Sequence, residues 1–269
     1  MTQTKNIIFI PAIAREKGDR HLGYKYGIAS WKKWAEKNNA EVFVMDKLIY
    51  PEREMLITWQ RWYVFDILEA NGIDTKLPKQ ILVTDADTII HPNCPNFFNM
   101  TDMKYSAVNH GGDFEWVARS IKNYSKYLFN SDTPLMRVDE YLANGFVVIN
   151  ETHRELLSNI LKMYHNNAER IVKSYEVIRT GKDQTVFNIL RYKSGVKYTV
   201  LPREYSLQDL NRKNLLYTDS RYWFEDSLEN LYQSGWIYQF NAIPENEFKR
   251  YTTYWMERIY KELYGDDIQ

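Results

Sequence analysis

Asp85 and Asp87 stand one residue apart, directly after the apolar run 81–83. This run, followed by another apolar stretch at 88–90, predicts a strand buried on both faces. Residues i and i+2 of extended backbone point to the same side, so both carboxylates can face one site. Oxygen ligands of this kind suit Mg²⁺ or Mn²⁺ and leave other coordination positions open. The alternative is a solvated pair of turn aspartates.

Two further polar pairs could take part in chemistry. Asn144-Gly145 precedes a predicted strand at 146–149, where a carboxamide and a residue without a side chain would allow a ligand to approach closely. It could equally be a simple turn. Asp183-Gln184 begins a predicted helix with a carboxylate and a carboxamide. The alternative for Asp183 is a helix N-cap.

Arg61 is a cation within an apolar helix face. On the predicted helix 56–70 it shares a stripe with Phe65 and Leu68. Such an arginine can bind a phosphate or a sugar, or it can extend its head group to water.

Strand and helix patterns alternate along the chain and must position these residues. We expect strands at 6–13, 41–45, 81–83, 105–109, 146–149 and 196–201, and helices at 24–37, 56–70, 113–129, 155–173, 183–192 and 245–264. The alternation predicts the α/β class, with a mostly parallel central sheet flanked by helices. Ligands of such sheets bind at the carboxyl ends of strands. With no repeat or linker, we expect a single domain over residues 1–269.

Composition excludes several classes of function. The 269 residues include 35 Lys and Arg and 35 Asp and Glu, so the absence of net charge argues against a nucleic-acid or acidic-membrane binder. The first predicted strand begins too soon after Met1 for a signal peptide or membrane span. A single cysteine, Cys94, rules out an intrachain disulfide. We therefore expect a soluble, cytoplasmic protein with no transmembrane segment and no nucleic-acid partner.

Three segments together resemble the GT-A glycosyltransferases. They are ILVTDADTIIHPNCPNFF at 81–98, NGFVVIN at 144–150 and GKDQTVFNILRYKSGVKYTVLP at 181–202. The resemblance is closest to the retaining, family-8-like group that includes glycogenin and bacterial galactosyltransferases. It implies a Rossmann-like domain with a nucleotide-sugar-binding half at about 1–110, an acceptor-binding half at about 111–269, and a C-terminal helical extension on the acceptor side.

The resemblance also implies an activity. The protein would move a sugar from a nucleotide-diphosphate sugar to a glycan, lipid-linked or protein acceptor, with Mn²⁺ or Mg²⁺ and with retention of configuration. A UDP-hexose is the favoured donor, and a GDP-sugar is the alternative. The resemblance places site residues in four regions: Asp85, Ala86 and Asp87 at the metal, diphosphate and ribose; Ile10, Pro11 and Ala12 at the base; Asn144 and Gly145 in the donor-sugar and acceptor pocket; and Asp183 and Gln184 near the anomeric carbon. Arg61, which the resemblance does not assign, is kept as a candidate for binding a phosphate or a sugar.

One feature departs from that group. A late histidine often supplies a third metal ligand there, but the corresponding segment here, WIYQFNAIP at 236–244, has none. Gln239 or Asn241 could replace it, or the two aspartates and the phosphates could suffice. His110 is a further candidate site residue. Aromatic residues crowd the segment before the last predicted helix, where they are either platforms for a sugar or part of the core or of an oligomer contact. They are Tyr217, Tyr222, Trp223, Phe224, Tyr232, Trp236, Tyr238 and Phe240.

Two other functions remain open. ILVTDADTI also fits the strand-D-x-D-x-T motif of haloacid-dehalogenase-like phosphatases, with Asp85 as nucleophile, although that motif belongs on a first strand and here follows two βα units. A non-catalytic carbohydrate-binding relative is the second. A nucleotidyltransferase is disfavoured because no glycine-rich loop with Lys or Arg follows the first strand.

Overall fold

The chain forms two compact units that interleave along the sequence. The computed structural model describes residues 4–14, 20–111, 113–208, 229–241, 243 and 252–268. The first unit comprises Met1–Lys47, Ile81–Met100 and Leu201–Gln269, and the second comprises Leu48–Gln80 and Thr101–Val200.

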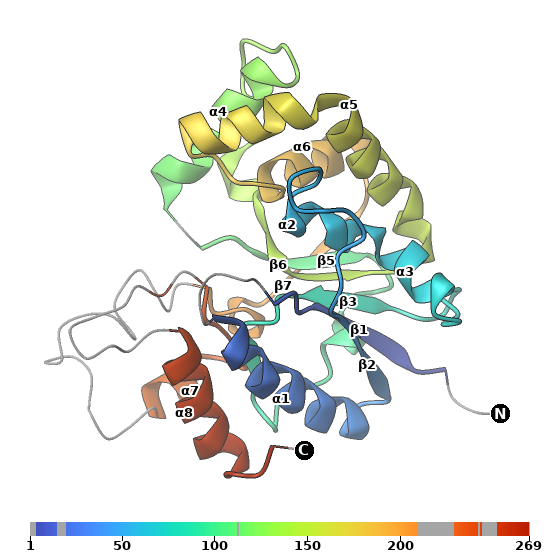
Figure 1. Cartoon of the computed structure of the whole chain (residues 1–269), viewed down its shortest axis with the longest axis vertical. Coiled ribbons are helices and arrows are strands. Elements are labelled where there is room, and N and C mark those ends of the chain that lie inside the picture. The colour runs from blue at the N-terminus through green and yellow to red at the C-terminus, as the bar shows by residue number, and fades with distance from the viewer. Residues whose placement is uncertain are drawn as a thin grey trace, which may run out of the picture. The chain divides into compact units, whose positions relative to one another are not determined.

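The first unit is built on three parallel strands. These are β1 (Asn6–Pro11), β2 (Ala40–Met45) and β3 (Ile81–Thr84), in the order β2-β1-β3. Phe9 of β1 is in register with Phe43 on one side and Val83 on the other. The side chains of residues 7–10 are fully buried, which explains why this strand reads as a continuous apolar run. The 3₁₀ turn η1 (Arg20–Gly23) leads into α1 (Tyr24–Lys37), which lies along these strands (Figure 1).

A small antiparallel pair completes the first unit. It joins β4 (Thr88–Ile90) to β8 (Ile237–Gln239), with Thr88 opposite Gln239. The helices α7 (Glu229–Ser234) and α8 (Thr252–Tyr264) and the 3₁₀ turns η3 (Phe97–Met100) and η6 (Arg203–Tyr205) also belong here. Tyr238 and Phe240 are fully buried in a core cluster with residues of α1 and α8. These two aromatic residues are therefore core, whereas the candidates Tyr217, Tyr222, Trp223 and Phe224 lie outside the described residues.

The second unit carries the strands β6, β5 and β7, in that order. Their bounds are β5 (Tyr105–Asn109), β6 (Leu142–Ile149) and β7 (Tyr198–Leu201), and β5 and β6 are antiparallel. Its helices are α2 (Ile57–Gln60), α3 (Val64–Ala70), α4 (Phe114–Tyr127), α5 (Arg154–Ile178) and α6 (Gln184–Ser194), with 3₁₀ turns η2 (Arg61–Tyr63), η4 (Val138–Glu140) and η5 (Glu151–His153). Helices α4, α5 and α6 pack on one another (Figure 1).

The predicted α/β class, with a mostly parallel central sheet flanked by helices, is confirmed. Helix α1 begins and ends where the sequence predicts, whereas several other elements differ in their bounds. Helix α5, for example, runs to Ile178 and not to residue 173. The predicted helix 56–70 is interrupted by η2 at Arg61, in a stretch of aromatic residues with weak helix propensity. Strand β6 starts at Leu142, so Asn144-Gly145 lies within the strand and is not a turn before it. Helix α8 begins at Thr252, and residues 245–251 of its predicted span lie outside the described residues.

In the part of the chain that the structure describes, no helix is both long enough and apolar enough to cross a membrane.

Candidate functional site

The two aspartates occupy a tight turn between β3 and β4. Asp87 is buried, with 3% of its surface exposed, and Asp85 is half-buried. The hydroxyl of Thr88 donates to the Asp85 carbonyl oxygen (2.7 Å) and accepts from Trp31 Nε1 (2.9 Å). These two hydrogen bonds attach the turn to α1 and fix the backbone that carries both carboxylates.

Gly27 makes this attachment possible. It lies on α1 beneath the turn, where an added Cβ would be 2.6 Å from the carbonyl oxygens of both Ala86 and Thr88. That separation is shorter than side chains tolerate, so only glycine lets the helix come this close.

Each carboxylate has a partner within the first unit. Gln239 Nε2 donates to Asp85 Oδ2 at 2.7 Å, across the β4–β8 pair. Arg20, from η1, forms an ion pair with Asp87. Gln239 is 4% exposed, and within the described residues its Oε1 has no hydrogen-bond partner.

These groups fit a hard divalent cation. Two carboxylates and a buried amide oxygen form a set of oxygen ligands of the kind that Mg²⁺ and Mn²⁺ prefer. Among the described residues no three His, Cys, Asp or Glu side chains cluster as metal ligands, so a third protein ligand here would have to be of another type, such as the Gln239 amide. Of the two substitutes considered for the missing histidine, Gln239 donates to Asp85.

Of the three residues at the end of β1 that were predicted to contact the base, two are accessible. Ile10 is fully buried, whereas Pro11 and Ala12 are half-buried. The Ala12 amide donates to the Met45 carbonyl oxygen (2.8 Å), which fixes the backbone there. Pro11 and Ala12 can therefore present side chains to a ligand, but Ile10 cannot.

A second cluster, in the second unit, is centred on Asp183. Asp183 Oδ2 accepts from Arg61 Nη2 (2.7 Å) and Trp62 Nε1 (3.0 Å), and Asn144 Nδ2 lies 3.4 Å from the same oxygen. Arg61, Asp183 and Asn144 are all buried. Arg61 therefore does not extend its charge to water, as one of the alternatives supposed.

Asp183 is the N-cap residue of α6, but its side chain makes no capping hydrogen bond. The carboxylate is turned toward Arg61 and Trp62 instead, so the capping alternative is wrong for this side chain. The preceding loop is held in place by Tyr124, whose hydroxyl donates to the Gly181 carbonyl oxygen (2.7 Å), and by Trp59 Nε1, which donates to that of Lys182 (3.2 Å).

Two amide side chains beside Asp183 have hydrogen-bonding capacity to spare. Asn144 Oδ1 and Gln184 Nε2 are buried and have no hydrogen-bond partner in the described part of the chain. Buried polar atoms are normally paired, so an acceptor and a donor that both lack a partner here point to hydrogen bonds with a ligand. Gly145 follows Asn144 in β6 and adds no side chain.

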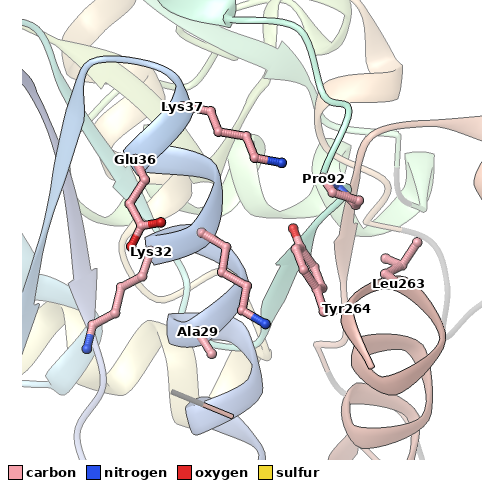
Figure 2. Close-up of a pocket in the computed structure, with 8 residues that line it drawn as sticks. Ala29, Lys32, Glu36, Lys37, Pro92, Leu263 and Tyr264 are labelled. Carbon is pink, nitrogen blue, oxygen red and sulfur yellow. The ribbon is translucent and has the colours of Figure 1, made fainter. Parts of the chain in front are cut away.

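A separate cavity of about 640 Å³ lies between α1 and α8, lined in part by Lys32, Lys33, Lys37 and Tyr264. Figure 2 shows Lys37 reaching toward Pro92 and Tyr264, while Lys32 points away. None of the predicted site residues lines this cavity.

Sequence reasoning missed Gly27, Arg20 and Trp62. Gly27 had a usable signal, because a glycine within a predicted helix costs stability and so indicates a packing requirement. Arg20 and Trp62 carried no comparable signal.

The fold resembles those of solved glycosyltransferases. A glycosyltransferase involved in glycosylation of the major capsid of PBCV-1 matches at a TM-score of 0.51 and 9% identity, covering 94% of this chain and 99% of that one. The bifunctional glycosyltransferase WbbM matches at 0.52 and 11%, covering 98% and 51%. GlyE of Streptococcus pneumoniae TIGR4 matches at 0.53 and 13%, covering 98% and 61%. The chain thus spans about half of the WbbM chain and under two thirds of the GlyE chain.

These likenesses confirm the predicted GT-A-like fold. No protein-family model matches the sequence, and no curated protein matches it.

Proposed function

From the glycosyltransferase fold and the two polar clusters, we propose that this protein is a metal-dependent glycosyltransferase. It transfers a sugar, from a UDP-hexose in preference to a GDP-sugar, to a hydroxyl group of an acceptor. One observation carries the proposal: the paired carboxylates of Asp85 and Asp87 lie in the turn after β3, with the unpartnered amide oxygen of Gln239 beside them.

Asp85, Asp87 and Gln239 are the residues that would hold Mn²⁺ or Mg²⁺. When bound, the ion would act as a Lewis acid for the departing diphosphate. The protein's part is to keep the three ligands in place: β4–β8 pairing carries Gln239, and the Thr88 hydroxyl fixes the turn. Ala86 supplies backbone in that turn, and Pro11 and Ala12 offer apolar surface to the base.

We assign the Asp183 cluster to the sugar of the donor. Arg61 and Trp62 both engage Asp183 Oδ2, so this carboxylate is an orienting negative charge that stabilises a cationic sugar, and not the base that removes the acceptor proton. Asn144 and Gln184 would bind sugar hydroxyls through their unpartnered amide atoms. This division of roles supports retention of configuration, because an inverting reaction needs a general base.

Calorimetric titration with UDP and then GDP, each with Mn²⁺ and with EDTA, tests the proposal. We expect metal-dependent binding of UDP, after which UDP-hexoses are screened for hydrolysis and transfer. Absence of binding by either nucleotide would overturn the proposal. Turnover of a phosphomonoester without nucleotide would then indicate the phosphatase function, and sugar binding independent of metal and nucleotide would indicate the non-catalytic one.

A further inference from the structure

Three aromatic side chains of the second unit form what we call the aromatic wall: His110, Trp116 and Tyr141. The ring centroid of His110 lies 5.7 Å from that of Trp116 and 5.6 Å from that of Tyr141. Trp116 and Tyr141 pack edge-on, with their ring centroids 6.4 Å apart. They come from the end of β5, from α4 and from the residue before β6. Residues far apart in sequence thus build one aromatic surface.

Trp116 is held rigidly in this wall. Its indole Nε1 donates to the Arg179 carbonyl oxygen (3.2 Å). Asp113 caps α4 by accepting from the amides of Glu115 and Trp116. The ring lies against Gly181, where an added Cβ would be 3.1 Å from ring atom Cη2. A tryptophan fixed in this way loses little entropy when a ligand stacks on it.

The aromatic wall adjoins the Asp183-Gln184 segment. The Tyr141 hydroxyl is hydrogen-bonded to Thr185 Oγ1 at 2.7 Å, directly after Gln184 at the start of α6. Gly181, which supports Trp116, is two residues before Asp183. The wall is therefore next to the residues that we assign to the donor sugar.

Two of the three rings of the aromatic wall differ from core side chains in their exposure. Trp31 and Trp34 of the first unit are fully buried, whereas Trp116 and His110 are only half-buried. Tyr141 is buried and packs against both of these rings from the core side. A half-exposed aromatic ring with its polar N–H already satisfied leaves an apolar face for a ligand. The C–H face of a pyranose ring matches that chemistry, since aromatic side chains suit sites that are apolar on one side and wet on the other.

We propose that the aromatic wall is the acceptor subsite and that it binds a pyranose ring of the acceptor on Trp116. The inference rests on the proposed function and narrows its acceptor class to a glycan. A protein or lipid acceptor with no sugar ring would not present the C–H face that this wall matches.

Saturation-transfer NMR with methyl β-galactopyranoside, methyl β-glucopyranoside and methyl β-N-acetylglucosaminide, in the presence of UDP and the diamagnetic ion Mg²⁺, tests the proposal. Wild-type protein is compared with Trp116→Phe, Trp116→Ala and a control, Phe114→Ala, which removes an exposed ring of the same helix outside the wall. We expect one or more glycosides to bind wild type and the control, and to bind Trp116→Ala about 3- to 10-fold more weakly, with Trp116→Phe intermediate.

The two proposals fail separately. Calorimetric UDP binding, which Trp116→Ala should keep, tests the donor site, and glycoside binding tests the aromatic wall. Binding of no glycoside by wild type, or equal binding by Trp116→Ala, would overturn the acceptor subsite. Thermal melting checks that each variant is folded, and Trp116→Phe carries the test if the alanine variant is not.

Discussion

Arg61 and Asp183 form a buried ion pair, with Nη2 and Oδ2 2.7 Å apart and the side chains 7% and 6% exposed. Trp62 donates to the same carboxylate oxygen. An ion pair this far from water contributes little net stability when intact, but removing one partner leaves a buried charge uncompensated. The pair fixes the position of the Asp183 carboxylate, as the proposed sugar site would require.

Removal of either partner should therefore destabilise the fold. Arg61→Met leaves Asp183 charged and buried, and we expect a loss of about 3–5 kcal/mol in the free energy of unfolding. Asp183→Asn keeps an oxygen that can accept from Trp62 but leaves the buried Arg61 guanidinium without its counter-charge, so we expect a loss of stability of similar size together with slower transfer. Urea denaturation and initial rates measure the two quantities. Equal stability of Arg61→Met and wild type would contradict the buried pair.

The aspartates of the β3–β4 turn should matter for binding more than for folding. We expect Asp85→Asn and Asp87→Asn to abolish metal-dependent UDP binding in calorimetry, with melting temperatures near that of wild type. Asp102→Asn, which removes an exposed carboxylate paired with Lys104, serves as the control and should bind normally. Unchanged UDP affinity in both site variants would rule out this turn as the metal site.

Arg20 should compete with the metal. Its guanidinium pairs with Asp87 while remaining 46% exposed, so removing it frees a carboxylate at small cost. We expect Arg20→Gln to strengthen Mn²⁺ binding by about 2- to 5-fold, matching the roughly 0.5–1 kcal/mol value of a partly exposed pair. Arg20→Lys, which keeps the charge, should stay close to wild type. Weaker Mn²⁺ binding by Arg20→Gln would show that the arginine supports the site.

Gly27→Ala should displace the β3–β4 turn that carries Asp85 and Asp87. The new Cβ would press on the carbonyl oxygens of Ala86 and Thr88, and overpacking of this kind costs about 1–3 kcal/mol. We expect lower stability together with weaker metal-dependent UDP binding. Lys32→Ala, on an exposed position of the same helix, should change neither property. Normal UDP affinity in a folded Gly27→Ala protein would mean that the turn tolerates displacement.

Stability should fall on mild acidification. Burial lowers the pKa of His153, and that of His91, below the usual 6.5. The unfolded chain then binds more protons than the folded one once the pH drops below about 6.5, so the free energy of unfolding is highest above that pH and declines beneath it. Urea denaturation at pH 7.5 and 5.5 measures the difference.

His153→Gln isolates one contribution to this pH dependence. The Asn150 amide donates to His153 Nδ1 (3.1 Å), and a glutamine oxygen can accept the same hydrogen bond without titrating. The loss between pH 7.5 and 5.5 should shrink in this variant. An undiminished loss would assign the effect to other groups.

The sequence by itself determined the features that depend on the spacing of residues close together in the chain. Apolar periodicity placed α1 at residues 24–37 and β5 at 105–109, because the spacing of apolar residues along a few turns or pleats decides which face is buried. The same local reasoning placed Asp85 and Asp87 at the end of a buried strand. It also identified Asp183-Gln184 as the start of a helix.

Only the tertiary structure decided which groups meet. Arg61 pairs with Asp183 across 122 positions, and Gln239 reaches Asp85 across 154. Such contacts follow from the path of the chain through the sheet, which local spacing does not encode. For the same reason Asp183 looks like a helix cap in the sequence, yet its carboxylate is bound by Arg61 and Trp62. A side chain's role here is set by the donors that surround it in space.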